Sequence, residues 1–190
     1  MKRSLFAAAL LLAACGREEG GNVAAPEGNG GAPPAAAGGE QPKTNLQQAL
    51  AGSADHKTLA NAVQAAGLAE TLSGAQPYTL FAPTEAAFQK LPAGAADGLL
   101  APEAKGQLVT LLTGHIVPGM VTAADLGKAI ERGKGKAQLA TVGGGTLTFG
   151  RDGDAIVVTD GAGGQARVTG AERLASNGVV HDVDGVLQGK

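Results

Sequence analysis

The residues best suited to chemistry in this chain are its three histidines, His56, His115 and His181. A histidine can transfer protons or bind a metal ion near neutral pH, because its ordinary pKa is about 6.5. Asp182 and Asp184 follow His181 closely, but successive side chains of a strand point to opposite faces. His181 and the two aspartates therefore do not converge on one point unless a bulge intervenes. This spacing argues against a metal site or a His–Asp catalytic pair.

His115 follows the expected end of a helix and begins a turn that we expect to be buried. An imidazole at this position can hydrogen-bond to backbone carbonyls that would otherwise have no partner. This structural role is favoured over proton transfer and metal ligation, which stay open as alternatives.

Three further patterns fall short of a catalytic or ligand-binding motif. Asp152-Gly153-Asp154 lacks the additional oxygen ligands and the closing glutamate of a calcium loop, and it is typical of a hairpin turn. Gly143-Gly144-Gly145 is not followed by the helix and lysine of a phosphate-binding loop. No serine lies in a nucleophile-elbow pattern. We therefore predict no catalytic, metal or cofactor site, and we expect that the protein is not an enzyme.

The elements that position these residues change character along the chain. In the first part apolar residues recur at helical spacing, with Asp55, Thr84 and Thr122 as predicted N-caps. Gly67 and Gly114 are expected just past the ends of two helices. After residue 136 the apolar pattern has a period of two. The predicted strands are 78–82, 138–142, 146–149, 155–159, 165–169 and 179–187. Helices followed by antiparallel strands predict an α+β fold.

Composition excludes some classes of function. The chain has 15 basic and 17 acidic residues and a formal net charge of -2, so it lacks the electrostatic footprint of a nucleic-acid-binding protein. The aromatic residues after position 43 are Tyr78, Phe81, Phe88 and Phe149, and there is no tryptophan. An aromatic platform for stacking sugars or bases is therefore not expected.

The N-terminus has the pattern of a secretion signal. Lys2 and Arg3 precede an apolar segment, residues 5–12, that is too short to span a bilayer as a helix. Residues 12–15, with the sequence LAAC, resemble a bacterial lipobox. That resemblance implies cleavage before Cys15 and a membrane anchor of two or three acyl chains on this residue. The alternative is an ordinary secretion signal with an unrelated cysteine.

The same resemblance indicates the bacterial cell envelope. Bacterial lipoproteins with aspartate directly after the cysteine tend to stay at the inner membrane, and here that residue is Gly16. We therefore expect the outer membrane, with its periplasmic and surface faces left open. The predicted organisation is a signal peptide at 1–14, a disordered Gly/Pro/Ala-rich tether that begins with the lipidated cysteine at 15–43, and one folded domain at 44–190.

Three segments of this domain resemble conserved blocks of the fasciclin (FAS1) domain family. They are residues 78–88 (YTLFAPTEAAF), 114–126 (GHIVPGMVTAADL) and 177–187 (NGVVHDVDGVL), and they occur in the order of the family. The similarity covers essentially residues 44–188. It implies a fold of two packed β-sheets with several short helices along one side, and no shared catalytic site.

The resemblance also implies a non-enzymatic adhesion or interaction module that contacts proteins or polysaccharides. Its candidate interaction or structural motif consists of His115, Ile116, Asp125 and Leu126, with Asp125 also expected in the first turn of the helix that Thr122 caps. The family often has tyrosine at the position of Gly114, so a receptor contact through that phenol is not expected. The alternatives are a carrier or sensor for a small apolar ligand and a hydrolase that uses His115 or His181.

Overall fold

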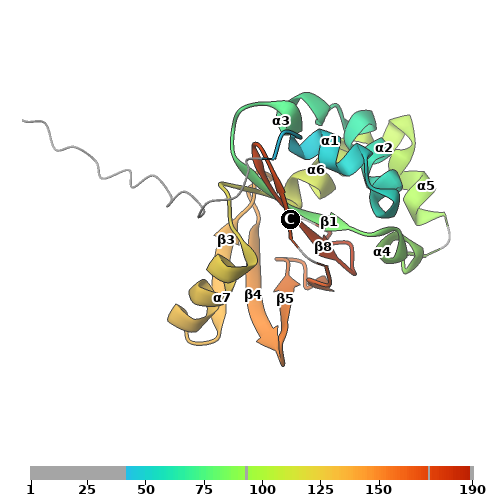
Figure 1. Ribbon diagram of the computed structural model, residues 1–190. Helices are drawn as coiled ribbons and strands as arrows, with labels where there is room; N and C mark the ends of the chain where they lie inside the picture. The colour runs from blue at the N-terminus through green and yellow to red at the C-terminus, as the bar shows by residue number, and fades with distance from the viewer. Residues whose placement is uncertain (1–41, 93, 171, 189–190) are drawn as a thin grey trace, which may run out of the picture. The chain divides into compact units, whose positions relative to one another are not determined.

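The computed structural model describes residues 42–92, 94–170 and 172–188 (Figure 1). The predicted signal peptide, the lipidation site at Cys15 and residues 15–41 of the predicted tether lie outside the described residues. No helix within the described range is long and apolar enough to cross a membrane.

The described residues form both helices and strands, as predicted for an α+β fold. The helical elements are α1 (Leu46–Ala51), the 3₁₀ helix η1 (Ala54–His56), α2 (Lys57–Ala66), α3 (Ala69–Ser73), α4 (Glu85–Gln89), α5 (Ala95–Leu100), the 3₁₀ helix η2 (Pro102–Ala104), α6 (Lys105–Gly114) and α7 (Ala123–Arg132). The strands are β1 (Tyr78–Pro83), β2 (Ile116–Pro118), β3 (Lys136–Ala140), β4 (Thr146–Asp152), β5 (Ala155–Thr159), β6 (Gln165–Arg167), β7 (Arg173–Ala175) and β8 (Gly178–Val183).

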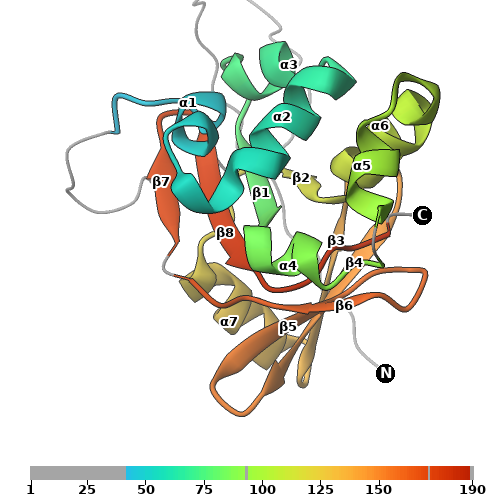
Figure 2. The ribbon, with the colours of Figure 1, turned by 90° about the vertical axis from the view of Figure 1, so that its right-hand side faces the viewer.

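The strands form two four-stranded sheets. Sheet A has the order β2-β1-β8-β7, and sheet B has the order β3-β4-β5-β6. All pairs are antiparallel except β1 and β8, which run parallel at the centre of sheet A (Figure 2). An antiparallel bridge between Val168 and Val183 connects the end of β6 to the end of β8.

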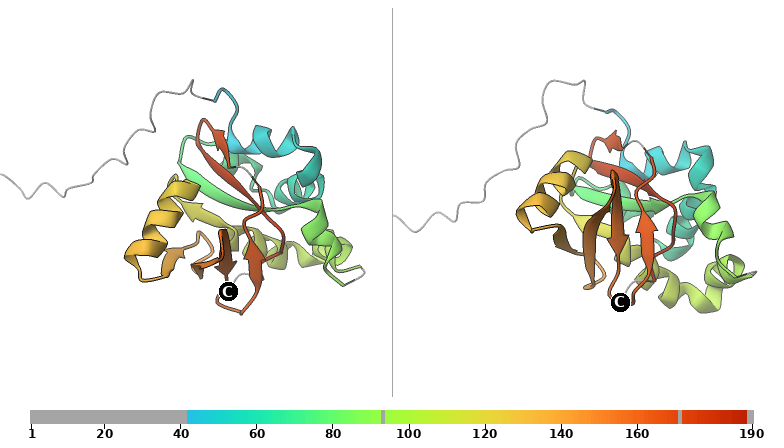
Figure 3. Two further views of the ribbon diagram at one scale, coloured as in Figure 1. Left: turned by 60° about the horizontal axis from the view of Figure 1, so that its bottom comes forward. Right: turned by 90° about the horizontal axis from the view of Figure 1, so that it is seen from below.

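Sheet A separates two hydrophobic cores. Leu80, Ala82 and Val180 point into a core that is covered by α1, α2, α3 and α6. Phe81 and Val183 point into a second core, which Leu126 and Ile130 of α7 share with Leu147, Phe149 and Val158 of sheet B. Figure 3 shows α7, in gold, on the opposite side of the strands from α1 and α2. Each face of sheet A is therefore buried, which explains the near-continuous burial of β1 and β8.

Several predicted helix ends are confirmed, whereas the predicted N-cap Asp55 and the predicted helix end before Gly114 are wrong. Thr122 and Asp125 form a reciprocal capping box at the start of α7, and the Thr84 side chain accepts from the Ala87 N–H. Gly67 ends α2 in the left-handed conformation, with φ 78°. Asp55 does not cap a helix, because it lies inside η1 and α2 begins after His56. The 3₁₀ turn carries His56 into the interior, where it is fully buried.

Strand boundaries differ from the predicted ones by a few residues. β8 ends at Val183, four residues before the predicted end, and β6 ends at Arg167. β4 continues through Gly150 to Asp152, three residues beyond its predicted end. α6 includes Gly114, and His115 is its C-cap. The short strands β2 and β7 were not predicted, because three residues are too few to show an alternating pattern.

Asn177 connects the helices to sheet A. Its Oδ1 accepts from the Leu46 N–H of α1 at 2.8 Å, and its Nδ2 donates to the carbonyls of Leu72 at 2.9 Å and Gly74 at 2.6 Å. The residue is buried in the two-residue turn between β7 and β8. One amide therefore satisfies three backbone groups from two helical segments.

We expect Asn177→Ala to lower the free energy of unfolding by about 3 kcal/mol, because it leaves buried backbone groups without partners. The matched control is Asn61→Ala, which removes an exposed amide from α2 and should change stability by less than about 0.5 kcal/mol. Urea unfolding followed by circular dichroism measures both variants. A loss for Asn177→Ala no larger than that of the control would contradict this role.

Candidate functional site

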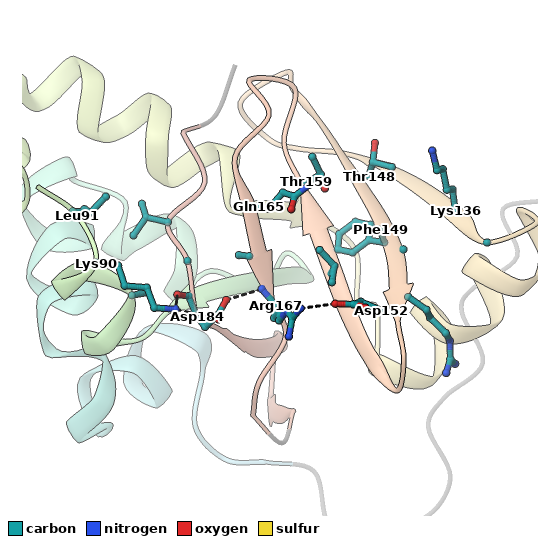
Figure 4. Close-up of a pocket in the computed structure, with 18 residues that line it drawn as sticks. Lys90, Leu91, Lys136, Thr148, Phe149, Asp152, Thr159, Gln165, Arg167 and Asp184 are labelled. Carbon is teal, nitrogen blue, oxygen red and sulfur yellow. Dashed lines mark hydrogen bonds and ion pairs between the residues drawn. The ribbon is translucent and has the colours of Figure 1, made fainter.

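The outer face of sheet B forms a polar groove of about 910 Å³ (Figure 4). One wall consists of Ala87, Lys90 and Leu91 at the end of α4, and of residues 184–186 after β8. Alternation along the strands builds the floor. Leu147 and Phe149 of β4, Val158 of β5 and Ala166 of β6 point into the second core, so the residues between them face outward.

Strand register aligns the outward residues in two rows across the sheet. The neutral row is Thr148, Thr159 and Gln165, which are direct cross-strand partners. The charged row is Lys136, Gly150, Val157 and Arg167, which are likewise aligned from β3 to β6. The groove floor therefore has a row of hydroxyl and amide groups beside a second row with one cation at each end.

Ion pairs connect the groove floor to its wall. Lys90 Nζ lies 3.1 Å from Asp184 Oδ2 and donates to the Asp184 carbonyl at 2.8 Å. Asp184 Oδ1 accepts from the Arg167 N–H at 2.7 Å, and the Arg167 guanidinium contacts Asp152 (Figure 4). Partial burial raises the pKa of Asp184, but the hydrogen bonds from Arg167 and Lys90 outweigh it, and the pKa is lowered. Such exposed pairs orient side chains more than they stabilise the fold.

A second groove, of about 770 Å³, lies between α5 and α6. Among the residues whose side chains the structure describes, none that lines this groove is charged. Leu91, Leu99, Leu111 and Val186 supply most of its apolar surface, and Gln107, Thr110 and Gln188 supply polar groups. Leu99 and Leu111 also line a small enclosed apolar space toward the first core. This groove can accept an apolar group.

His115 makes the structural contacts that its position suggests. It is fully buried, its Nδ1 lies 2.8 Å from the Leu111 carbonyl, and its Nε2 accepts from the Leu187 N–H at 3.0 Å. These partners require a neutral ring with the proton on Nδ1. Burial lowers the pKa of His115 to about 4. His115 therefore connects the end of α6 to the C-terminal segment and does not face solvent.

The other residues of the predicted motif are also engaged in the fold. Ile116 and Leu126 are buried, one in each hydrophobic core. Asp125 is exposed and its carboxylate accepts from the Thr122 hydroxyl at 2.8 Å; this hydrogen bond lowers the pKa of Asp125. Within the described domain, Asp125 is thus the one member of the motif whose side chain reaches solvent.

His181 is buried against the second core. Its ring stacks on Phe81 with centroids 5.3 Å apart, and its Nε2 lies 2.8 Å from the Val121 carbonyl. Asp182 points to the other side of β8, where its carboxylate accepts two 2.8 Å hydrogen bonds from Arg173. His181 and Asp182 therefore do not act on one point, as alternation along the strand indicates.

A cluster around His56 was not found from the sequence. Ser53 Oγ lies 2.9 Å from His56 Nδ1, and Arg173 donates to Ser53 Oγ at 2.9 Å. His56 Nε2 lies 3.3 Å from Asp182 Oδ1, although the angle is outside hydrogen-bonding geometry. Burial lowers the pKa of His56, and the Asp182 carboxylate partly offsets this effect. Ser53 and His56 are distant in the sequence from Arg173 and Asp182 of the β7–β8 hairpin, and no local spacing signals that these two segments meet.

This cluster contains the residue types of a Ser–His–Asp triad but lacks the access that catalysis needs. His56 is fully buried and Ser53 nearly so, and the Ser53 hydroxyl already accepts from Arg173. None of these residues lines either groove. Among the described residues, no group of three or more histidine, cysteine, aspartate or glutamate side chains could hold a metal ion. The two grooves are larger than a third open hollow of about 480 Å³ beside the start of α1, and they are the accessible candidate surfaces considered for binding.

Comparison with known proteins identifies the family. A model of the fasciclin domain matches residues 54–189. This chain belongs to the fasciclin domain family. It is 43% identical over 141 residues to Protein sll1483 of Synechocystis sp., covering 74% of this chain and 71% of that protein. It is 36% identical over 144 residues to the transforming growth factor-beta-induced protein ig-h3 of Sus scrofa, covering 75% of this chain but only 19% of that protein.

A solved structure of a FAS1 domain pair from the insect cell adhesion molecule Fasciclin I has the same fold. The TM-score is 0.67 at 18% sequence identity, and the match covers 76% of this chain and 51% of that one. The FAS1-like fold of two packed sheets with helices, predicted from the three sequence blocks, is thereby confirmed.

The buried histidines predict a loss of stability in acid. His115 has a folded-state pKa of about 4 against about 6.5 when unfolded, so the unfolded state binds more protons below pH 6.5. Its contribution of about 3 kcal/mol is complete above pH 6.5 and is lost as the pH falls to about 4. The lowered pKa of His56 acts in the same direction.

NMR titration of the imidazole resonances separates this effect from that of the carboxylates. We expect the His115 ring to remain neutral through the pH range in which an exposed histidine titrates. A His115 ring that titrates near pH 6.5 would contradict the buried, doubly hydrogen-bonded geometry.

Proposed function

We propose that this chain is a membrane-anchored, non-enzymatic interaction module of the bacterial cell envelope, which contacts proteins or polysaccharides through its fasciclin domain. One observation carries the proposal: the side chains suited to catalysis are buried in structural hydrogen bonds, while the outer face of sheet B presents an open polar groove. The similarity to a domain pair from a cell adhesion molecule supports the same function.

The anchor is proposed from the N-terminal sequence. Lys2, Arg3, the apolar residues 5–12 and Cys15 have the order of a lipoprotein signal, and Gly16 favours the outer membrane. Each buried methylene of an acyl chain contributes about 0.8 kcal/mol, so two or more chains hold the protein durably. Residues 16–43 would then separate the domain from the lipid headgroups.

Cells of the native host test anchor and domain separately. We expect Cys15→Ser to move the protein from the membrane fraction to the soluble fraction, because the acyl chains that hold it are missing. Mass spectrometry of the wild-type N-terminus should find an acylated Cys15. We expect loss of residues 44–190 with the anchor retained to reduce attachment or aggregation of the cells, or the integrity of their envelope.

Two outcomes would contradict the proposal. A mature wild-type protein that begins beyond residue 15 or carries no fatty acid would remove the anchor. Unchanged attachment, aggregation and envelope integrity after loss of the domain would remove the interaction function.

The apolar groove between α5 and α6 favours a second candidate function, a carrier or sensor for a small apolar ligand. Gly98 and Gly106 line this groove, and a Cβ on either would enter open space. We expect native mass spectrometry of protein purified from its own host to show a retained apolar compound. Gly98→Leu should fill the groove and lower the retained amount. Wild-type protein without any bound compound would contradict this function.

A further inference from the structure

Gly150 lies in the interior of β4 without a structural reason for glycine. Its register is unbroken on both sides, opposite Lys136 on β3 and Val157 on β5, so it does not form a bulge. An added Cβ would meet only the Gly135 carbonyl oxygen at 3.7 Å, an ordinary contact. Glycine weakens a strand, and inside one it often marks a place where a ligand approaches closely. Gly150 therefore opens the middle of the charged row to a bound chain.

The two ends of the charged row are cations. Lys136 and Arg167 are three strand spacings apart, about 14 Å at their backbones. In the described part of the chain, Lys136 has no acidic partner within ion-pair distance. The Arg167 guanidinium has five N–H donors, and its contact with Asp152 occupies one nitrogen. Both ends can therefore bind further acceptors.

The groove as a whole is basic although the chain is acidic. Its lining includes Lys90, Lys136 and Arg167 against Asp152 and Asp184, and also Arg151, whose guanidinium pairs with Glu131 of α7; the formal net charge of the chain is -2. Both carboxylates are already paired with groove cations. This local excess of positive charge favours an anionic partner, and an arginine fork can bind a carboxylate through two parallel hydrogen bonds.

The neutral row favours a glycan over a peptide. Thr148, Thr159 and Gln165 present hydroxyl and amide groups that suit the hydroxyls of a sugar chain. A protein partner typically gains its affinity from aromatic or aliphatic anchors in deep pockets. Along the charged row, the floor between the two cations consists of Gly150 and Val157, which carry no side chain and a short side chain.

We propose that the outer face of sheet B binds a polysaccharide strand that bears carboxylate groups and crosses β3 to β6 along the charged row. Lys136 and Arg167 bind carboxylates at the two ends, the chain passes over Gly150 and Val157, and its hydroxyls contact the neutral row. This assignment rests on the proposed interaction function and names the partner class and the contact surface.

The test measures binding of oligogalacturonate to the full chain in non-ionic detergent by isothermal titration calorimetry. The methyl ester of the same oligosaccharide is the uncharged ligand control. We expect Lys136→Gln with Arg167→Gln to weaken binding about tenfold, because two charge contacts are lost. The matched protein control, Lys57→Gln with Lys105→Gln, removes the same charge from exposed positions outside the groove and should bind like the wild type.

Gly150→Val tests the floor independently of charge. A β-branched side chain suits a strand, so the melting temperature should be unchanged or raised. The added methyl groups occupy the path of the glycan, and binding should weaken about tenfold, as for loss of both end contacts. Retained binding in this variant would overturn the assignment to the charged row.

Three other results would overturn the proposal. They are no binding of oligogalacturonate by the wild type, equal loss in the two double-glutamine variants, and equally tight binding of poly-glutamate, which would make the partner an acidic peptide. If loss of the domain still impairs attachment of cells, the interaction function stands and only the glycan assignment fails.

Discussion

The parallel pairing of β1 with β8 is the interaction on which the rest of the domain depends. It joins Tyr78 to Gly178 and Pro83 to Val183, so it closes a loop of about 100 residues. At its start the strands approach so closely that a Cβ on Gly178 would lie 2.1 Å from the Tyr78 carbonyl oxygen. Because its side chains alternate between the two hydrophobic cores, this pair supports the helices on one face and sheet B on the other.

The same pair places the polar residues that could otherwise have done chemistry. β8 directs His181 onto Phe81 and directs Asp182 toward Arg173 and His56 on the opposite face. His181 and His56 are fully buried and Asp182 is mostly buried, and their contacts connect segments that are distant in the sequence. Sheet B differs from sheet A in that only its inner face packs against a hydrophobic core. Its outer face is therefore available for a partner.

Local patterns in the sequence were sufficient for local structure. The capping pair Thr122–Asp125 and the strand 155–159 were predicted because each depends on neighbouring residues. The parallel β1–β8 pair and the His56 cluster depend on contacts between distant segments, which no spacing reveals. The charged row was missed for a related reason: the predicted strand stopped at residue 149, and only the register shows that Gly150 lies between Lys136 and Val157.

The central claim is that the outer face of sheet B is the binding surface of this fasciclin domain. Chemical-shift mapping of backbone amides during addition of oligogalacturonate tests it most directly. We expect shifts concentrated in β3 to β6 around Lys136, Gly150 and Arg167, with the residues between α5 and α6 unchanged. Shifts confined to α5 and α6, or spread evenly over every exposed lysine, would contradict it.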